Sequence, residues 1–173
     1  TGLGDSKFGV KLTDVIALYQ KAAELKEIEI EGISCHIGSL VESTAPYMSE
    51  IEVLSVFVNE LLDRGIALKH FDIGGGAGVA YKADEKTLEP SELIPAVVAQ
   101  IRSLVKIPDI EILIEPGRSI IAQAGVLLTR VEYLKSGLFE RNFCVVDASM
   151  TELVRPAMYG SHHEIEPVSP RSD

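Results

Sequence analysis

Residues 69–78 read Lys-His-Phe-Asp-Ile-Gly-Gly-Gly-Ala-Gly, a short run with apolar residues that leads directly into glycines. Most of the strands expected along the chain are continuous apolar runs, which are typical of a parallel sheet that is buried on both faces. Glycines at the end of such a strand let backbone N–H groups converge on an anion, because no side chain blocks the approach. The stretch therefore predicts a buried parallel strand that ends at a candidate phosphate site.

The alternation of strands and helices extends to both sides of this stretch. Strands are expected at residues 7–10, 28–37, 69–73 and 110–115, and helices at residues 14–25, 44–64 and 90–105. This order indicates a parallel sheet covered by helices, which fits both a (β/α)8 barrel and a doubly wound sheet. A complete barrel needs eight such units in roughly 250 residues, and about four are recognisable here. As a barrel, this part of the chain would be about half of one.

The pattern changes after residue 122. Residues 126–134 and 143–146 are apolar and rich in β-branched side chains, without a helix of normal length between them. Such runs favour antiparallel strands of a separate β region. The predicted domains are therefore a partial β/α barrel over residues 1–122 and the beginning of a β domain over residues 123–173.

The composition narrows the classes of function. The chain has 173 residues and a formal net charge of -10, which argues against nucleic acid and against anionic membranes as partners. No apolar run reaches the roughly 18 residues of a membrane span, and no signal peptide is recognisable, so we expect a cytoplasmic protein. Cys35 and Cys144 lie in apolar runs without metal-ligand spacing. We therefore expect buried free thiols and no metal site.

Three groups of polar or small residues follow three of the expected strands. They lie at the carboxyl ends of the strands, where a barrel or an open α/β sheet places its active site. The groups are His36 with Ser39, then Gly74, Gly75 and Gly76, and finally Glu115, Gly117 and Arg118. Their shared position predicts that they meet at one edge of the sheet.

The chemistry of each group suits a different part of one ligand. His36 can stack on a flat ring, and the glycines together with Ser39 can donate to a phosphate. Glu115 ends an apolar strand, so we expect it to be partly removed from water and to need a cationic partner, such as a protonated pyridine ring. Together the three groups describe a site for pyridoxal phosphate.

Each group also has a purely structural explanation when it is considered alone. His36 can be a core histidine whose ring nitrogens have hydrogen-bond partners inside the protein. The glycines can form a flexible loop, and Glu115 can form an ion pair with Arg118. Further along the chain stand Arg155 and Tyr159, and the guanidinium of Arg155 has a planar fork that suits a carboxylate. Considered alone, Arg155 is better explained as a structural arginine on the surface.

In their order along the chain and in their amino-acid sequence, these groups resemble the motifs of the fold-type III PLP-dependent decarboxylases. That family pairs a barrel of the alanine racemase type with a β-sandwich domain, and the resemblance covers essentially the whole chain. Glu-Pro-Gly-Arg at residues 115–118 is shared with ornithine and arginine decarboxylases. Its continuation into Ser-Ile, and Arg-Pro-Ala-Met-Tyr at residues 155–159, resemble the diaminopimelate branch of the family.

The resemblance implies the second half of an alanine racemase-like (β/α)8 barrel followed by the start of a β-sandwich. It also implies a homodimer that converts meso-2,6-diaminopimelate, an amino-acid substrate, to L-lysine and CO2. His36 would stack on the ring of the cofactor, and Glu115 would keep its nitrogen protonated. Arg118, Arg155 and Tyr159 would bind a substrate carboxylate. The phosphate would be held by Ser39, Gly74, Gly75, Gly76, Gly117 and Arg118.

The resemblance also implies that this segment is catalytically incomplete. The family's Schiff-base lysine lies upstream, and its catalytic cysteine, which comes from the neighbouring subunit, lies downstream; Cys35 and Cys144 do not match it. Smaller departures from the family pattern are Leu40, Ala77 and Ser149. Three alternatives remain open at this point: an ornithine- or arginine-type decarboxylase, a non-catalytic homologue that acts as a binding module, and an unrelated phosphate-binding barrel.

Overall fold

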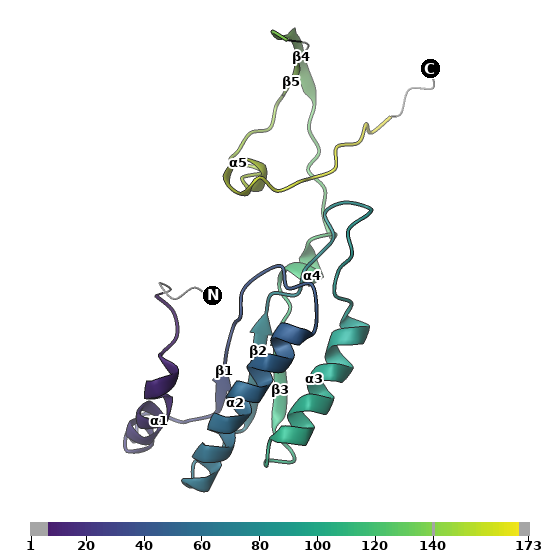
Figure 1. Ribbon diagram of the computed structural model, residues 1–173. Coiled ribbons are helices and arrows are strands. Elements are labelled where there is room, and N and C mark those ends of the chain that lie inside the picture. The colour runs from purple at the N-terminus through teal and green to yellow at the C-terminus, as the bar shows by residue number, and fades with distance from the viewer. Residues whose placement is uncertain (1–6, 140, 170–173) are drawn as a thin grey trace. The chain divides into compact units, whose positions relative to one another are not determined.

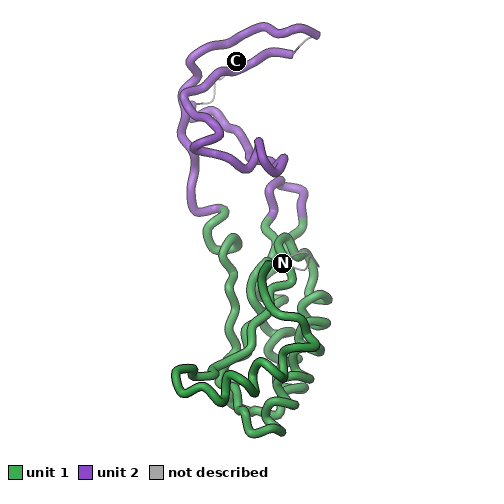
Figure 2. Tube along the Cα trace, turned by 90° about the vertical axis from the view of Figure 1, so that its left-hand side faces the viewer, with its two compact units in different colours: residues 1–79, 86–122 green, residues 80–85, 123–173 purple. Residues whose placement is uncertain are grey.

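The computed structural model describes residues 7–139 and 141–169. The chain divides into two compact units, which Figure 2 shows in different colours. The first unit comprises Thr1–Val79 and Lys86–Ala122, and the second comprises Ala80–Glu85 and Gln123–Asp173. The short segment Ala80–Glu85 therefore interrupts the first unit in sequence and belongs to the second.

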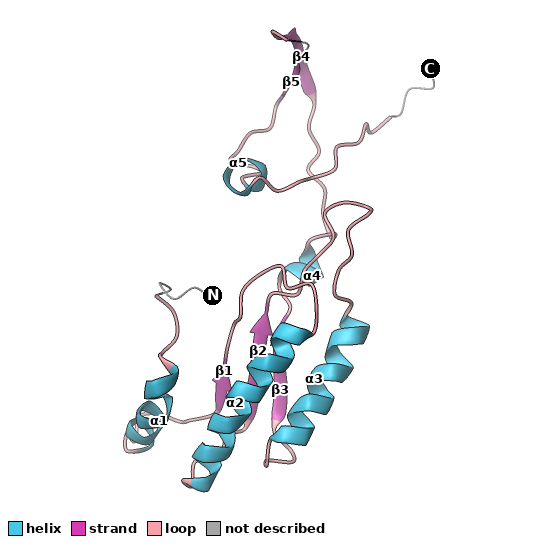
Figure 3. Cartoon of the chain, in the orientation of Figure 1, coloured by secondary structure: helices cyan, strands magenta, loops and turns pink. Residues whose placement is uncertain are grey.

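The first unit contains a sheet of three parallel strands, as the continuous apolar runs predict (Figure 3). Strand β2 (His70–Gly75) lies between β1 (Gly32–Ser34) and β3 (Glu111–Glu115). Both pairings are parallel, with a shift of register in β2 between Asp72 and Gly75. All three strands consequently present their carboxyl ends at the same edge.

Two long helices cover this sheet. Helix α2 (Ala45–Asp63) and helix α3 (Pro90–Leu104) pack against each other, and Figure 1 shows them side by side over the strands. Both begin with a proline in the first turn, where its fixed φ suits the helix and its missing N–H is not needed. Gly65 follows α2 with a φ of 83°, the left-handed conformation that ends many helices.

The core of the first unit fills the layer between these helices and the sheet. Its fully buried side chains include Ile51, Val58 and Leu61 of α2, Phe71 and Ile73 of β2, and Val97 and Ile101 of α3. The Asn59 side chain joins the two helices, because it donates to the Leu104 carbonyl and accepts from the Lys106 N–H, both at 2.8 Å. This amide satisfies backbone groups that the end of α3 leaves unpaired.

The beginning of the chain differs from the sequence-based expectation. Residues 7–10 form bends instead of a strand: they are exposed, Gly9 has a φ of 74°, and no described strand lies beside them. The strand expected at residues 28–37 is reduced to β1. Helix α1 (Val15–Ala23) follows a 3-10 turn, Leu12–Asp14, and is not capped by Thr13, whose hydroxyl donates to Asp14 Oδ1 at 3.0 Å. The described sheet thus has three strands and not four.

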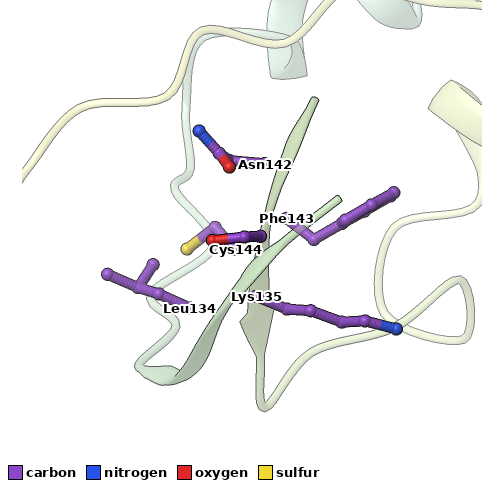
Figure 4. Close-up of a pocket in the computed structure, with 6 residues that line it drawn as sticks. Leu134, Lys135, Asn142, Phe143 and Cys144 are labelled. Carbon is purple, nitrogen blue, oxygen red and sulfur yellow. The ribbon is translucent and has the colours of Figure 1, made fainter. Parts of the chain in front are cut away.

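The second unit contains an antiparallel hairpin. Strands β4 (Val131–Ser136) and β5 (Asn142–Val146) pair with each other, which confirms the antiparallel strands expected there. Leu134 pairs with Cys144 and Lys135 with Phe143, and the two pairs point to opposite faces of the hairpin (Figure 4). Six residues line an open pocket on it: Leu134, Lys135, Ser136, Asn142, Phe143 and Cys144.

The hairpin carries little buried surface. All residues of β4 are exposed, and the residues of the hydrophobic core belong to the first unit. Both cysteines are free, as expected, but Cys144 is exposed, because neither face of the hairpin is covered within the described residues. In the part of the chain that is described, no helix is long and apolar enough to cross a membrane.

Candidate functional site

The carboxyl ends of the three parallel strands bring residues from distant parts of the sequence together. His36 follows β1, Gly74 and Gly75 end β2, and Glu115 ends β3. Gly75 lies opposite Glu115 in the register of the sheet, and the Gly75 N–H donates to His36 Nδ1 at 3.3 Å. Three of the groups expected from the sequence therefore meet at one edge.

The glycine run is required by the close approach of these strand ends. A side chain at Gly75 would overlap the carbonyl oxygen of Glu115, and one at Gly76 would overlap that of Gly38. Gly74 and Gly76 also have φ angles of 65° and 94°, which side chains rarely adopt. The run is thus a packed junction of strands, and the flexible-loop explanation is wrong.

The loop that carries Ser39 is bound alongside the glycine run. The Val41 N–H donates to the Gly76 carbonyl, and the Gly78 N–H donates to the Val41 carbonyl, both at 2.9 Å. Within this loop Leu40 has a φ of 62°, a strained conformation for a residue with a branched side chain. The two hydrogen bonds hold the exposed Ser39 next to the glycines.

The His36 ring has a fixed orientation. Because its Nδ1 accepts the hydrogen bond from Gly75, a neutral imidazole carries its proton on Nε2. The ring lies against the glycine run, since an added Cβ at Gly74 would stand 3.2 Å from His36 Nδ1, and one at Gly76 would stand 3.5 Å from Cε1. The half-buried ring therefore lies at the strand ends, oriented by its hydrogen bond from Gly75.

Glu115 is exposed, so the expectation that it is partly removed from water is wrong for this chain. The reason lies in the sheet: β3 is bordered by β2 on one side and by no second strand among the described residues. Among the ion pairs of the described residues, Glu115 and Arg118 do not form one, which removes the expected structural alternative.

A tight turn follows Glu115. The Pro116 carbonyl accepts both the N–H of Ser119, at 3.0 Å, and its hydroxyl, at 2.8 Å. Gly117 has a φ of 38°, and the half-buried Arg118 begins the short helix α4 (Arg118–Ile121). Gly117 and Arg118 thus lie within a few residues of the strand ends.

Glu50 is an acidic residue beneath the site that the sequence reasoning missed. It is only 6% exposed on α2, and neither carboxylate oxygen has a hydrogen-bond partner. Burial raises the pKa of Glu50 to about 7; the nearby Cys35 thiol opposes this rise, and the Asp72 carboxylate adds to it. Burial and the Glu50 carboxylate raise the pKa of the Cys35 thiol to about 11, so this thiol is a poor nucleophile.

Arg155 and Tyr159 lie together in the second unit, on helix α5 (Arg155–Tyr159). The guanidinium carbon of Arg155 is 5.5 Å from the centre of the Tyr159 ring and 5.7 Å from that of the Tyr81 ring. Arg155 Nη2 also donates to Ser161 Oγ at 2.9 Å. The sequence reasoning missed Tyr81 and Ser161, because neither lies in a recognisable motif. The strand-end group and the Arg155 group belong to different units.

Comparisons with known proteins identify the family of the chain. Residues 1–122 match the family described as pyridoxal-dependent decarboxylase, pyridoxal binding domain. The chain is 41% identical to diaminopimelate decarboxylase of Pseudomonas aeruginosa over 171 residues. This match covers 99% of the chain and 40% of that relative. The chain therefore spans about 40% of the length of the curated relatives it matches.

Solved structures give the same result. Diaminopimelate decarboxylase from Helicobacter pylori, complexed with L-lysine, is 32% identical with a TM-score of 0.89, over 99% of this chain and 42% of that one. SrLDC in complex with PLP and cadaverine is 28% identical with a TM-score of 0.78, over 91% of this chain and 40% of that one. An unrelated phosphate-binding barrel is thereby ruled out. The matched domain is one that binds pyridoxal phosphate, and the chain belongs to the pyridoxal-dependent decarboxylase family.

Proposed function

We propose that the protein containing this chain decarboxylates meso-2,6-diaminopimelate to L-lysine and CO2, as a cytoplasmic homodimer that uses pyridoxal phosphate. The observation that carries the proposal is the meeting of His36, the glycine run and Glu115 at one edge of a parallel sheet. The relatives named diaminopimelate decarboxylase support the choice of substrate.

The strand ends fit the proposed cofactor. A Cβ added at Gly38 would meet nothing within 4 Å, and one at Gly117 only the Glu115 carbonyl at 3.9 Å, so open space adjoins the site on two sides. When bound, the cofactor supplies a ring that accepts the electron pair left by the loss of CO2. Its phosphate would be held by donors from Ser39, Gly74, Gly75, Gly76, Gly117 and Arg118.

His36 and Glu115 would have separate roles toward that ring. The hydrogen bond from the Gly75 N–H occupies His36 Nδ1 and orients the imidazole, which would stack on the ring of the cofactor. The exposed carboxylate of Glu115 is free of an ion pair with Arg118 and can hold a proton at the ring nitrogen. These are the two residues to which we assign direct roles in the reaction.

Arg155 and Tyr159 supply the observation that favours diaminopimelate over ornithine or lysine as substrate. Diaminopimelate carries a second carboxylate at the end remote from the reacting carbon, whereas ornithine and lysine carry only an amine there. The planar guanidinium of Arg155 matches the two oxygens of such a group. Arg118 would bind a substrate carboxylate as well.

We further propose that residues 1–122 are part of the second half of an alanine racemase-like (β/α)8 barrel. In a barrel, strands that follow one another in sequence are neighbours, and the order β1-β2-β3 fits this rule. In the described part of the chain β1 and β3 are edge strands, to which further barrel strands could pair. Residues 123–173 would begin the β-sandwich domain.

The test is a comparison of wild-type full-length protein with its Glu115→Gln variant. We expect wild-type protein to form L-lysine and CO2 from meso-diaminopimelate, and to be inactive on L-ornithine and L-lysine. The variant should bind pyridoxal phosphate, seen as its visible absorbance band, and lose activity by about a hundredfold or more, since an uncharged ring accepts electrons poorly.

Three results would count against this proposal. Wild-type turnover of ornithine or lysine in preference to diaminopimelate would reassign the substrate. Turnover by Glu115→Gln within a few-fold of wild type would remove the role of Glu115 at the ring nitrogen. A protein that binds the cofactor but turns over none of these amino acids would favour a non-catalytic binding module.

A further inference from the structure

We propose that Tyr81 and His163 are positioning residues for Arg155, and that they hold its guanidinium ready to receive the remote carboxylate of the substrate. This inference rests on the proposed function, because it concerns the residue to which substrate recognition is assigned there. Tyr81 and His163 lie outside the motifs singled out in the sequence. Both belong to the second unit together with Arg155.

Two aromatic rings lie beside the guanidinium of Arg155. Tyr81 and Tyr159 both lie within the distance of about 6 Å at which a cation is attracted to a ring face. Tyr159 is on the same short helix as Arg155 and follows it by one turn. Tyr81 comes from the segment Ala80–Glu85, more than seventy residues earlier in the chain. It therefore ties Arg155 to a distant part of the sequence.

The guanidinium of Arg155 also has a hydrogen-bond partner, the Ser161 hydroxyl. Gly160 ends helix α5 with a φ of 59°, and this left-handed residue turns the chain back on itself. Ser161 is thereby placed where its hydroxyl accepts from Arg155 Nη2, at 2.9 Å. One edge of the guanidinium is thus fixed by Ser161, in addition to the contacts with the rings.

Two nitrogen atoms of the cluster lack a hydrogen-bond partner among the described residues. Arg155 Nε and His163 Nε2 are both buried, and neither has a hydrogen bond to the described residues. Unpaired buried polar atoms are unfavourable and rare in native proteins, and a functional role is one explanation for them. The His163 ring stands edge-on to the Tyr81 ring, with centres 6.1 Å apart. His163 thus supports Tyr81, which in turn faces Arg155.

Tyr81 lies in a short turn that is held by hydrogen bonds. It follows Gly78 by three residues, directly after the loop that packs on the glycine run. The Glu85 carboxylate accepts from the N–H groups of Tyr81, at 2.8 Å, and of Lys82, at 3.3 Å, which fixes the turn that presents Tyr81. The turn at Ala80–Glu85 therefore fixes the ring that Tyr81 adds to the Arg155 cluster within the second unit.

The experiment measures, by calorimetry on the full-length protein loaded with pyridoxal phosphate, how tightly it binds L-lysine and cadaverine. L-Lysine, the product of the proposed reaction, keeps the carboxylate that was remote from the reacting carbon of diaminopimelate, whereas cadaverine has no carboxylate. Only lysine can therefore report on Arg155. We expect Tyr81→Leu to weaken lysine binding by about three- to thirtyfold, the range of cation–π contacts, and to leave cadaverine binding unchanged. The KM for diaminopimelate should rise by the same factor, with a smaller change in kcat.

Three further variants complete the test. Tyr81→Phe keeps the ring face and should restore lysine binding to within about twofold of wild type, because the hydroxyl is not what meets the cation. His163→Ala should weaken lysine binding less than Tyr81→Leu does, since it acts through Tyr81. Tyr133→Leu is the matched control, because this tyrosine is 69% exposed on β4 of the same unit. It should leave the binding of both lysine and cadaverine unchanged.

The outcomes separate this inference from the proposed function. Lysine binding by Tyr81→Leu that equals wild type overturns the inference, and so does an equal loss of lysine and cadaverine, which would mark a general structural defect. If wild-type protein fails to turn over diaminopimelate, the proposed function fails. The lysine and cadaverine titrations do not depend on turnover, and they decide the role of Tyr81 in either case.

Discussion

Glu50 lies on the apolar face of α2, one turn after Tyr47 and one turn before Leu54, both of which are buried. Its carboxylate has no hydrogen-bond partner, so the ionised form is costly and the protonated form is favoured. The folded-state pKa of about 7 lies above the ordinary value of 4.5. The stability that comes from the protonated acid is therefore fully present below pH 4.5, and it is lost as the pH rises through 7.

The variant Glu50→Gln should remove this dependence, because an amide of the same shape does not ionise. We expect its free energy of unfolding to be close to that of wild type at pH 5 and greater by roughly 2–3 kcal/mol at pH 8.5. Urea unfolding of the full-length protein at the two pH values measures the difference. Glu52→Gln, at an exposed position on the same helix, is the control. Equal pH dependence in all three proteins would show that Glu50 is not buried in solution.

At the scale of single residues, the sequence predicted those that follow strands and stand in recognisable runs. His36, the glycines and Glu115 were found because strand ends of a parallel sheet share one edge. Glu50 carried a usable signal, an acid at an apolar position of a helix, which was passed over. Tyr81 carried no local signal, since its contact with Arg155 depends on how distant segments meet.

At the scale of elements, the carboxyl end of β2 is the most constrained part of the fold. A methyl group at Gly75 would overlap the Glu115 carbonyl, and β3 would have to move away from β2. Gly75→Ala should therefore reduce the free energy of unfolding by about 1–3 kcal/mol, the usual cost of overpacking, and weaken cofactor binding. Thermal unfolding of the full-length protein, with and without added cofactor, measures both effects.

Gly125→Ala is the matched control, because a Cβ there meets nothing within 4 Å and its φ is not in the left-handed region. We expect it to change neither stability nor cofactor binding. If Gly75→Ala proves as stable as Gly125→Ala, the strand ends are less tightly packed than the structure describes.

The elements that the sequence predicted well carry their own boundaries. Helix α2 has a proline in its first turn and Gly65 after its end. Strand β3 is an apolar run between two glutamates, and β2 ends in the glycine run. The elements that it predicted poorly depend on partners. Residues 7–10 have a strand-like composition, but a strand forms only where another strand lies beside it, and local sequence does not state this.

At the scale of the whole molecule, the parallel sheet and its helices followed from the alternation of patterns, whereas a barrel and a doubly wound sheet share that alternation. The two architectures differ in how strands beyond β1 and β3 are ordered, which three strands cannot decide from their own sequences. The hairpin β4–β5 is likewise recognisable, but its exposed faces are compatible with several β architectures.

The last prediction is that the 173-residue chain alone forms no lysine from diaminopimelate. The resemblance to the family places the Schiff-base lysine upstream of this segment. Lys69 cannot replace it, because it precedes β2 and pairs with Glu29 at 2.6 Å and Glu31 at 3.1 Å, which precede β1. Lys69 thus lies at the opposite end of the strands from Gly75, about 20 Å away at the rise of a β-strand.

The measurement is the amount of lysine formed when the purified chain is mixed with pyridoxal phosphate and diaminopimelate, with the full-length protein as the positive control. Borohydride reduction followed by peptide mapping then reports whether one lysine of the chain reacts specifically with the cofactor. Sustained turnover that Lys69→Ala or Lys7→Ala abolishes would contradict the prediction, because it would mean that a lysine of this segment had taken over the catalytic role. Without such a lysine the proposed cofactor site has no group that can join the cofactor covalently to the chain.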